Sequence, residues 1–255
     1  MSTRRSFECF GLVIHGYDWL RTLEHLDEHV RRVVPTWIVT ANPEILLAAK
    51  REAGYWQTVR QADLRLVDGV GLQLAGRLAG ASPKRMTGVA LAERLVALAA
   101  ERGWNVALVG GGGGVADTAA WKLRKRYPTL TIVAEQGGAV DDSGVGDAVN
   151  DETVHRLTLQ TPDVLLVAFG HPKQEEWIRR NLDALPGVKV AVGIGGTFDY
   201  WTGTAAMAPT VIRRIGLEWL WRLIREPRRW RRILDAVVVF PWVFVLDRLR
   251  RPKST

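Results

Sequence analysis

Residues 164–185 read VLLVAFGHPKQEEWIRRNLDAL, and the order of these residues decides the fold class. The run Val164–Phe169 is continuously apolar, as a strand buried on both faces must be. Gly170 then ends the run, and the stretch Pro172–Leu185 is polar with apolar residues at helical spacing. The segment therefore predicts a buried strand that leads through a short turn into a helix.

The same alternation of short apolar runs and longer amphipathic runs extends from about Phe10 to Ile194. Further strand-like runs are Trp37–Thr40, Leu64–Val67, Val106–Val109, Thr131–Ala134 and Val188–Val192. Helical stretches such as Val89–Arg102 and Val115–Tyr127 lie between them. Strands that alternate with helices predict an α/β fold, with a mainly parallel, Rossmann-like sheet and helices on both faces.

Charge divides the chain into two parts. The net charge is +8, and residues 204–255 account for all of it, with twelve basic and four acidic residues. We therefore predict an α/β core of residues 1–203 and a basic, tryptophan-rich helical appendage of residues 204–255. Pro209 predicts the start of a helix that runs to Arg225, and Pro227 suits the first position of a second helix. A cationic appendage needs an anionic partner, such as nucleic acid, acidic lipid or a phosphorylated substrate.

The sequence also indicates where the protein acts. The single cysteine, Cys9, excludes an internal disulfide and fits a reducing compartment. The N-terminus lacks the apolar run of a signal peptide, and the apolar run Ala236–Leu246 is shorter than a spanning helix. Arginines interleaved with Trp219 and Trp221 favour a membrane interface. We expect a cytoplasmic protein that is peripheral on the inner face of the plasma membrane.

Ligands of open parallel sheets bind beyond the carboxyl ends of the strands, so the residues that follow each strand are candidates for the site. Thr40 and Asn42 follow the first of these strands, and Asn42 also suits a helix N-cap before Pro43. Asp68 follows Leu64–Val67. It is either a turn aspartate or a carboxylate that takes a proton from an acceptor hydroxyl.

Glycines follow two other strands. Gly110, Gly111 and Gly112 begin a five-glycine run that opens a helix, which is a favourable place for phosphate. The run also matches a loose dinucleotide-binding pattern, with Glu135 where a ribose-binding acid would lie. The turn after the last strand contains Gly196 and Asp199.

Lys173 and Gln174 fall in the first turn of the helix that Pro172 begins. A lysine there interacts unfavourably with the helix dipole, which indicates that Lys173 binds an anion. The sequence contains no Asp-x-Asp pair, so a metal bound by such a pair to a donor diphosphate is not expected.

Taken in order, these motifs resemble the WecG/TagA/CpsF glycosyltransferases of bacterial surface-polymer assembly. The resemblance covers about Phe10 to Arg232. Its segments are TANPE (40–44), DGVG (68–71), RMTG (85–88), GHPKQE (170–175), GGTFD (195–199) and GLEWLWRL (216–223), followed by Glu226-Pro227.

The resemblance implies an inverting hexosyltransferase that moves a sugar, often of the N-acetylmannosamine type, from a UDP-sugar to a polyprenyl-diphosphate-linked acceptor. Such an enzyme serves the synthesis of cell-surface polysaccharide or a teichoic-acid-like polymer, and we expect it to need no metal or other cofactor. The family's proposed base falls on Asp68. Its other site residues fall on Thr40, Asn42, Arg85 and Gln174, and its appendage arginines on Arg214, Arg222 and Arg225.

Two departures from the family pattern leave the sugar and the acceptor open. Ala90 stands where an acidic residue is usual, and Met207 where an arginine is usual. A NAD-dependent oxidoreductase, based on the glycine run, and a nucleic-acid-binding protein, based on the basic appendage, are the alternatives. We prefer the glycosyltransferase and expect no nucleic-acid partner. The oligomeric state is left open, a homo-oligomer included.

Overall fold

The structure is a computed structural model that describes residues 5–250, apart from the side chains of Arg213, Arg214 and Arg229. Its centre is a six-stranded sheet in the order β4-β3-β8-β7-β5-β6, and every neighbouring pair is parallel. The strands are β3 (Thr36–Ala41), β4 (Leu64–Val67), β5 (Val106–Gly110), β6 (Ile132–Glu135), β7 (Val164–Ala168) and β8 (Val190–Gly193). The predicted α/β class is confirmed.

Each strand predicted from an apolar run is present, with its ends displaced by at most two residues. Burial on both faces is the reason, since every residue of β3 and β5 is buried. Successive side chains enter two separate cores, with Val39 and Val167 in one and Ile38 and Leu166 in the other.

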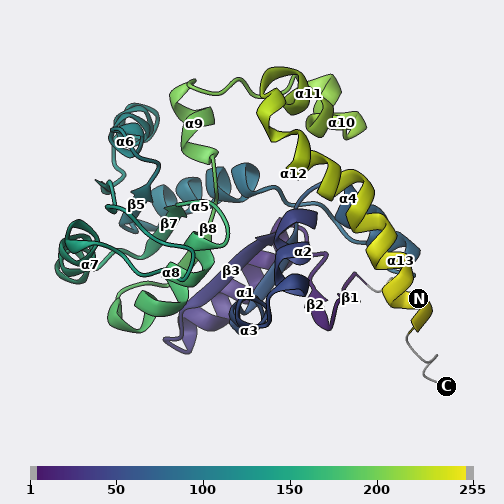
Figure 1. Cartoon of the computed structure of the whole chain (residues 1–255). Helices are drawn as coiled ribbons and strands as arrows, with labels where there is room; N and C mark the ends of the chain where they lie inside the picture. Colours follow the sequence, from purple (N-terminus) through teal and green to yellow (C-terminus); the bar gives the residue numbers. More distant parts are fainter. Residues whose placement is uncertain (1–4, 251–255) are drawn as a thin grey trace.

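Helices cover both faces of the sheet (Figure 1). One core contains side chains of α2 (Pro43–Arg51), α3 (Ala53–Gln61), α4 (Val70–Leu78), α7 (Ala148–Gln160) and α8 (Lys173–Asn181). The other contains side chains of α1 (Trp19–Arg31), α5 (Gly88–Arg102), α6 (Val115–Arg126) and α9 (Thr197–Thr202). The short 3-10 helix η1 (Leu182–Ala184) follows α8, so the three helical stretches predicted from the sequence are all present.

An antiparallel hairpin precedes the sheet and was not predicted. It consists of β1 (Phe7–Cys9) and β2 (Leu12–Ile14), with Phe10 and Gly11 as its turn. Both turn residues have positive φ, 53° and 81°. Asparagine or aspartate is usual at the first of these positions. Because Phe10 stands there instead, the sequence does not predict the turn. Phe10 is buried, and its packing against the C-terminal segment favours this conformation.

The C-terminal segment is a chain of short helices. They are α10 (Thr210–Ile215), α11 (Glu218–Arg225), the 3-10 helix η2 (Pro227–Arg229), α12 (Trp230–Leu234), the π-helix η3 (Asp235–Val239) and α13 (Phe240–Arg250). Pro227 begins the second part, as predicted, but the predicted helix from Pro209 to Arg225 is interrupted at Gly216. This glycine has a φ of 78°, and a Cβ there would clash with Val70 of α4. The helix breaks because the chain must pass close to the core.

Helix α13 contains Pro241 near its start, and the chain stays helical there because the π-helix η3 precedes it. Proline lacks an N–H and crowds the preceding turn, and a π-helical segment changes the hydrogen-bond register at that point. In the described residues, no helix is both long enough and apolar enough to cross a membrane.

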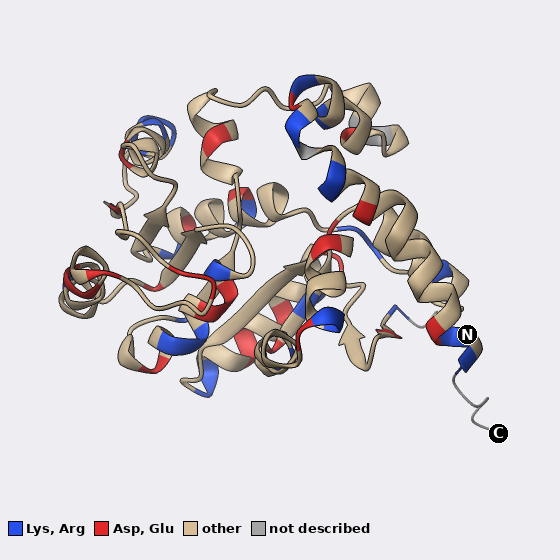
Figure 2. Cartoon of the chain, in the orientation of Figure 1, with Lys and Arg blue, Asp and Glu red and all other residues tan. Residues whose placement is uncertain are grey.

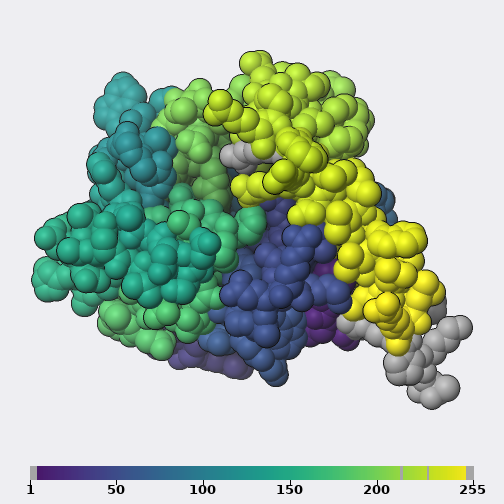
Figure 3. All heavy atoms as spheres, viewed as in Figure 1, coloured from purple at the N-terminus to yellow at the C-terminus, as the bar shows by residue number. Residues whose placement is uncertain are grey.

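The C-terminal segment packs along the core rather than standing apart from it (Figures 1 and 3). Phe240 and Phe244 are 0% and 1% exposed and belong to the same core as Phe10, whose ring meets theirs edge-on at 5.9 and 6.5 Å. Ion pairs add to this contact, with nitrogen–oxygen distances of 2.9 Å for Lys50–Asp247, 3.1 Å for Arg51–Asp235 and 2.7 Å for Arg232–Glu44. The division at residue 203 stays a prediction.

Candidate active site

Parallel strands bring their carboxyl ends to one edge of the sheet, here called the carboxyl edge. β4, β3 and β8 are neighbours, and directly after them come Asp68, Asn42 and Ile194. β7 and β5 continue the same edge with the segments that begin at Phe169 and Gly111. The candidates predicted from strand ends therefore lie along one edge.

Backbone hydrogen bonds fix Asp68 at the end of β4. Its N–H donates to the Ala41 carbonyl at 2.8 Å, and its half-buried carboxylate accepts from the Gly88 N–H at 3.2 Å. Burial raises the pKa of Asp68 to about 6, while the Gly88 N–H and the charges of Arg222 and Arg85 act in the opposite direction. At neutral pH the group is mostly ionised and still basic enough to accept a proton, as a general base must be.

Arg85 reaches the same place from the loop between α4 and α5. The neighbouring Met86 N–H donates to the Val67 carbonyl at 2.8 Å, which holds this loop against the end of β4. The Arg85 guanidinium pairs with Glu218 of α11 at 2.8 Å. Both Arg85 and Glu218 act electrostatically on Asp68, so this ion pair joins the core to the C-terminal segment beside the candidate base.

Arg222 of α11 brings a second cation to the site. Its Nε donates to the Tyr200 hydroxyl of α9 at 2.9 Å, and its guanidinium carbon lies 5.5 Å from the centroid of that ring. The positive charge of Arg222 lowers the pKa of Asp68. Basic residues are visible on α11 and α12 in Figure 2. The C-terminal segment therefore supplies part of the environment of Asp68.

The other two arginines singled out in the appendage are placed differently. Arg225 is exposed and stacks on Trp221, with its guanidinium carbon 5.0 Å from the ring centroid. The side chain of Arg214, in α10, lies outside the part of the chain that the structure describes. A role for either at the site stays a prediction.

Thr40 and Asn42 support the carboxyl edge from β3. The buried Thr40 hydroxyl donates to the Gly193 carbonyl of β8 at 3.0 Å. Asn42 is the N-cap of α2, where its side-chain oxygen accepts from the Ile45 N–H at 2.9 Å and Pro43 begins the helix, as predicted. Both side chains thus have a structural partner, and contact with a substrate stays a prediction for each.

Gln174 and Lys173 point to different places from the start of α8. Gln174 is only 3% exposed, and its side-chain oxygen accepts from the Gly195 N–H at 3.0 Å. Lys173 donates to the Val140 carbonyl at 2.7 Å and lies 3.9 Å from Asp142, so it holds the loop before α7. That loop already gives the lysine an anionic neighbour, and donor binding by Lys173 stays a prediction.

The glycine run before α6 is exposed at Gly111, Gly112 and Gly113. Gly110 to Gly114 all have positive φ, which only glycine adopts readily. A side chain at Gly110 would lie 3.0 Å from Phe169, and one at Gly111 would lie 3.1 Å from Phe198, whereas Gly112 faces open space. Gly196 and Asp199 lie at the start of α9, which also carries Phe198.

The chain matches the family model of the glycosyl transferase WecG/TagA/CpsF family over residues 7–254. It belongs to this family. The chain is 33% identical to an N-acetylglucosaminyldiphosphoundecaprenol N-acetyl-beta-D-mannosaminyltransferase of Bacillus spizizenii, over 78% of this chain and 75% of that protein. Proteins of the same name match from Staphylococcus aureus MRSA252 (33% identity, 80% and 77%) and from Bacillus subtilis 168 (29% identity, 84% and 81%). The predicted family is confirmed, and the chain is a glycosyltransferase.

The residue that suggested a nicotinamide cofactor is engaged elsewhere in this glycosyltransferase. Glu135 is 8% exposed and pairs with Arg156, whose Nε and Nη2 donate to one of its oxygens at 3.0 and 2.9 Å. Its carboxylate is therefore not presented to a ribose. Among the described residues, no group of three or more histidine, cysteine, aspartate or glutamate side chains could hold a metal ion.

Sequence reasoning missed Tyr200, Glu218 and Gly88 as parts of the candidate site. All three lie within or beside the family segments, but nothing in their residue type marks them. Tyr200 and Glu218 matter only because the C-terminal segment returns to the carboxyl edge, which follows from its path past Gly216. Gly88 matters through its backbone N–H, which no sequence pattern distinguishes.

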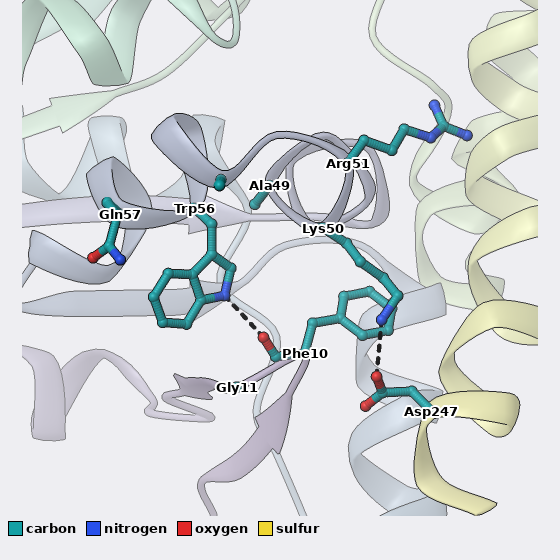
Figure 4. A pocket seen from close by; sticks show the side chains of 9 residues that line it. Phe10, Gly11, Ala49, Lys50, Arg51, Trp56, Gln57 and Asp247 are labelled. Carbon is teal, nitrogen blue, oxygen red and sulfur yellow. Dashed lines mark hydrogen bonds and ion pairs between the residues drawn. The ribbon is translucent and has the colours of Figure 1, made fainter. Parts of the chain in front are cut away.

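A groove of about 530 Å³ lies away from the carboxyl edge, between the hairpin turn, the end of α2 and α13 (Figure 4). Its cations are already paired, because Lys50 contacts Asp247 at 2.9 Å and also lies 4.5 Å from the centroid of the Phe10 ring. Trp56 closes one side by donating to the Phe10 carbonyl at 2.9 Å. The groove is part of the packing interface between the core and the C-terminal segment.

Proposed function

We propose that this glycosyltransferase moves an N-acetylmannosamine-type sugar from a UDP-linked donor to a glycan carried on a polyprenyl diphosphate, in the synthesis of a cell-surface polysaccharide or a teichoic-acid-like polymer. The names of its relatives support the sugar and the acceptor, since they are N-acetyl-beta-D-mannosaminyltransferases of N-acetylglucosaminyldiphosphoundecaprenol. The observation that carries the proposal is the position of Asp68 at the carboxyl edge, within electrostatic reach of Arg85 and of Arg222 of α11.

In the proposed reaction Asp68 accepts the proton of an acceptor hydroxyl. The freed oxygen attacks the anomeric carbon of the donor sugar from the side opposite to the UDP. A carbon–oxygen bond forms, the bond to the diphosphate breaks, and UDP leaves with the electron pair, which inverts the anomeric centre. A pKa near 6 suits Asp68 to this role, since the group is ionised at neutral pH and gains a proton readily as the hydroxyl loses it.

The negative charge that develops on the leaving UDP must be stabilised by hydrogen-bond donors and cations at the carboxyl edge. We assign this role to the N–H group of the exposed Gly112 and to cationic side chains such as Arg85 and Arg222, since Gly110 is buried in β5 and the Gly111 N–H donates to the Ala168 carbonyl at 3.2 Å. Such groups stabilise a leaving diphosphate when they are held in place before the reaction. In this account the enzyme needs no divalent metal, and Lys173, Gly196 and Asp199 are further candidates for contact with the donor.

The C-terminal segment also supports a peripheral position on an anionic membrane, at the inner face of the plasma membrane. Its outward face carries a stripe of exposed apolar side chains, with Trp230 53%, Val238 56%, Trp242 66% and Leu249 76% exposed. Arginines flank this outer stripe, and each contributes about 1 kcal/mol near an anionic surface. The inward residues Phe240 and Phe244 pack on the core, so only half of the apolar run is available to lipid.

Binding and turnover test this function together. UDP should bind and NAD(H) should not, and a panel of UDP-sugars with a lipid-diphosphate N-acetylglucosamine acceptor should give turnover with one N-acetylated sugar, unchanged by EDTA. Loss of activity in EDTA that Mg²⁺ or Mn²⁺ restores would overturn the metal-free account. Turnover with none of the UDP-sugars would overturn the proposal that the sugar donor is a UDP-sugar.

A further inference from the structure

A buried carboxyl group lies behind the carboxyl edge and takes no part in the proposed chemistry. Glu175, in the first turn of α8, is 0% exposed. One of its oxygens accepts from the Tyr55 hydroxyl of α3 at 3.0 Å, and the other accepts from the Gln174 side-chain nitrogen at 2.7 Å. Burial raises the pKa of Glu175 to about 7. Burial of a carboxyl group destabilises a fold, so a role for Glu175 is expected.

Glu175 fixes the orientation of the Gln174 amide. A side-chain amide has one donor end and one acceptor end. Because the Glu175 oxygen takes the donor end, the oxygen of Gln174 faces the other way, where it accepts from the Gly195 N–H at 3.0 Å. The Gln174 side chain also packs closely against the end of β8, since a Cβ on Gly193 would be only 2.6 Å from the Gln174 nitrogen.

The end of β8 also lies close to Gly88, which supports Asp68. The Ile194 carbonyl lies 3.8 Å from the position that a Cβ of Gly88 would take. The Gly88 N–H is the donor to the Asp68 carboxylate. The Thr40 hydroxyl holds the preceding residue of β8, Gly193, at its carbonyl. Hydrogen bonds therefore run from Tyr55 through Glu175 and Gln174 to Gly195, and the residue before Gly195 lies near the Gly88 backbone that holds the candidate base.

We propose that Glu175 is a positioning residue, which orients the Gln174 amide so that the Gly195 backbone, and with it the end of β8, stays in place beside Gly88 and Asp68. Glu175 touches no substrate in this account. The inference rests on the proposed function for its effect on turnover, but its effect on the Gly195 N–H is independent of any substrate.

Two substitutions at Glu175 separate this role from simple burial. In Glu175→Gln the new side-chain oxygen still accepts from Gln174, and the new N–H₂ donates to the Tyr55 hydroxyl, because a hydroxyl can donate or accept. In Glu175→Leu no acceptor remains, so the Gln174 amide loses its orientation. A matched control is Ile178→Ala, which removes volume from the same buried face of α8 and whose apolar side chain takes no part in these hydrogen bonds.

The experiment measures kcat and donor KM, the Tm, and the exchange rate of the Gly195 amide hydrogen in each variant. We expect Glu175→Leu to lower kcat roughly 10- to 100-fold with KM changed less than about threefold, and to speed Gly195 exchange at least about tenfold, since small displacements of a site reduce turnover strongly. Glu175→Gln should stay within about threefold of the unaltered protein in both measurements. Ile178→Ala should lower Tm while it leaves kcat and Gly195 exchange near the original values.

Equal losses in Glu175→Leu and Ile178→Ala would overturn the inference, and so would a Glu175→Gln variant as impaired as Glu175→Leu. If Glu175→Leu does not fold, Tyr55→Phe removes one hydroxyl only and should still speed Gly195 exchange, and unchanged exchange there would overturn the inference. If the unaltered protein turns over none of the UDP-sugars, the proposed function fails, and the Gly195 exchange rates still decide the role of Glu175.

Discussion

At the scale of single residues, the pKa of Asp68 reflects two opposing effects. Burial favours the neutral form, whereas the Gly88 N–H, Arg222 and Arg85 favour the charged form. We expect Asp68→Asn, which keeps the shape and removes the basicity, to lower kcat by about 10²–10⁴ with UDP affinity retained. Steady-state kinetics and calorimetric titration with UDP check this. Glu93→Gln, on the exposed face of α5, is the control, and unaltered turnover in Asp68→Asn would remove the base assignment.

The same carboxyl group sets an expectation for the pH dependence. Asp68 acts as a base only when ionised, so kcat/KM should fall as the pH drops through about 6 and level off above it. A profile of kcat/KM measured from about pH 5 to about pH 8.5 checks this, because the range extends to both sides of the expected pKa. A profile that stays flat down to the lower end of this range would mean that burial does not raise the pKa of the Asp68 carboxyl group.

Among single residues, the sequence predicted where the strand-end candidates lie but not which residues they contact. Asp68, Asn42 and Arg85 follow strands or lie in family segments, so their place at one edge follows from the parallel order of the sheet. The buried state of Gln174 could not be predicted, because its amide is covered by Glu175 and by Gly193, which are brought together only in the folded chain.

At the scale of elements, the apolar strands were predictable because burial on both faces demands continuous apolar residues. The hairpin Phe7–Ile14 was not, because its strands are three residues long and Phe10 occupies a turn position with a φ of 53°. The break between α10 and α11 was also missed. It depends on the close approach of Gly216 to Val70, which no local pattern reveals.

The element that most affects the site is α11, through Arg222. Removal of this charge should raise the pKa of Asp68, because Arg222 favours the ionised carboxyl group. We expect Arg222→Gln to lower kcat roughly 10- to 100-fold and to move the acid limb of the pH profile above pH 6. Arg228→Gln, an exposed arginine of the same segment, is the control. A limb that stays in place in Arg222→Gln would show that α11 does not act on Asp68.

At the scale of the whole molecule, the C-terminal segment does two things at once. Its inner face completes a core through Phe240 and Phe244, and its arginines carry the excess positive charge of the chain. Removal of residues 204–255 would uncover Phe10 and the core around it, so single substitutions test the outer face more cleanly than truncation does.

We expect Trp242→Ser to weaken binding to phosphatidylglycerol vesicles by roughly tenfold, because a Trp ring leaves water when it enters the interface. Trp121→Ser is a matched control, since Trp121 is 52% exposed on α6 and Trp242 is 66% exposed on α13. Vesicle co-sedimentation at several salt concentrations measures both. Equal binding by the two variants would place the membrane contact elsewhere.

The most direct test of the account is the identity of the product. The purified protein would be incubated with UDP-N-acetylmannosamine and a lipid-diphosphate N-acetylglucosamine acceptor, beside the Asp68→Asn variant, and the lipid product would be analysed by mass spectrometry and by NMR of the new anomeric centre. The account predicts a lipid-linked disaccharide with one added N-acetylated sugar, inverted at the anomeric carbon, and release of UDP, with little product from the variant. Transfer with retained configuration, or equal product from Asp68→Asn, would contradict it.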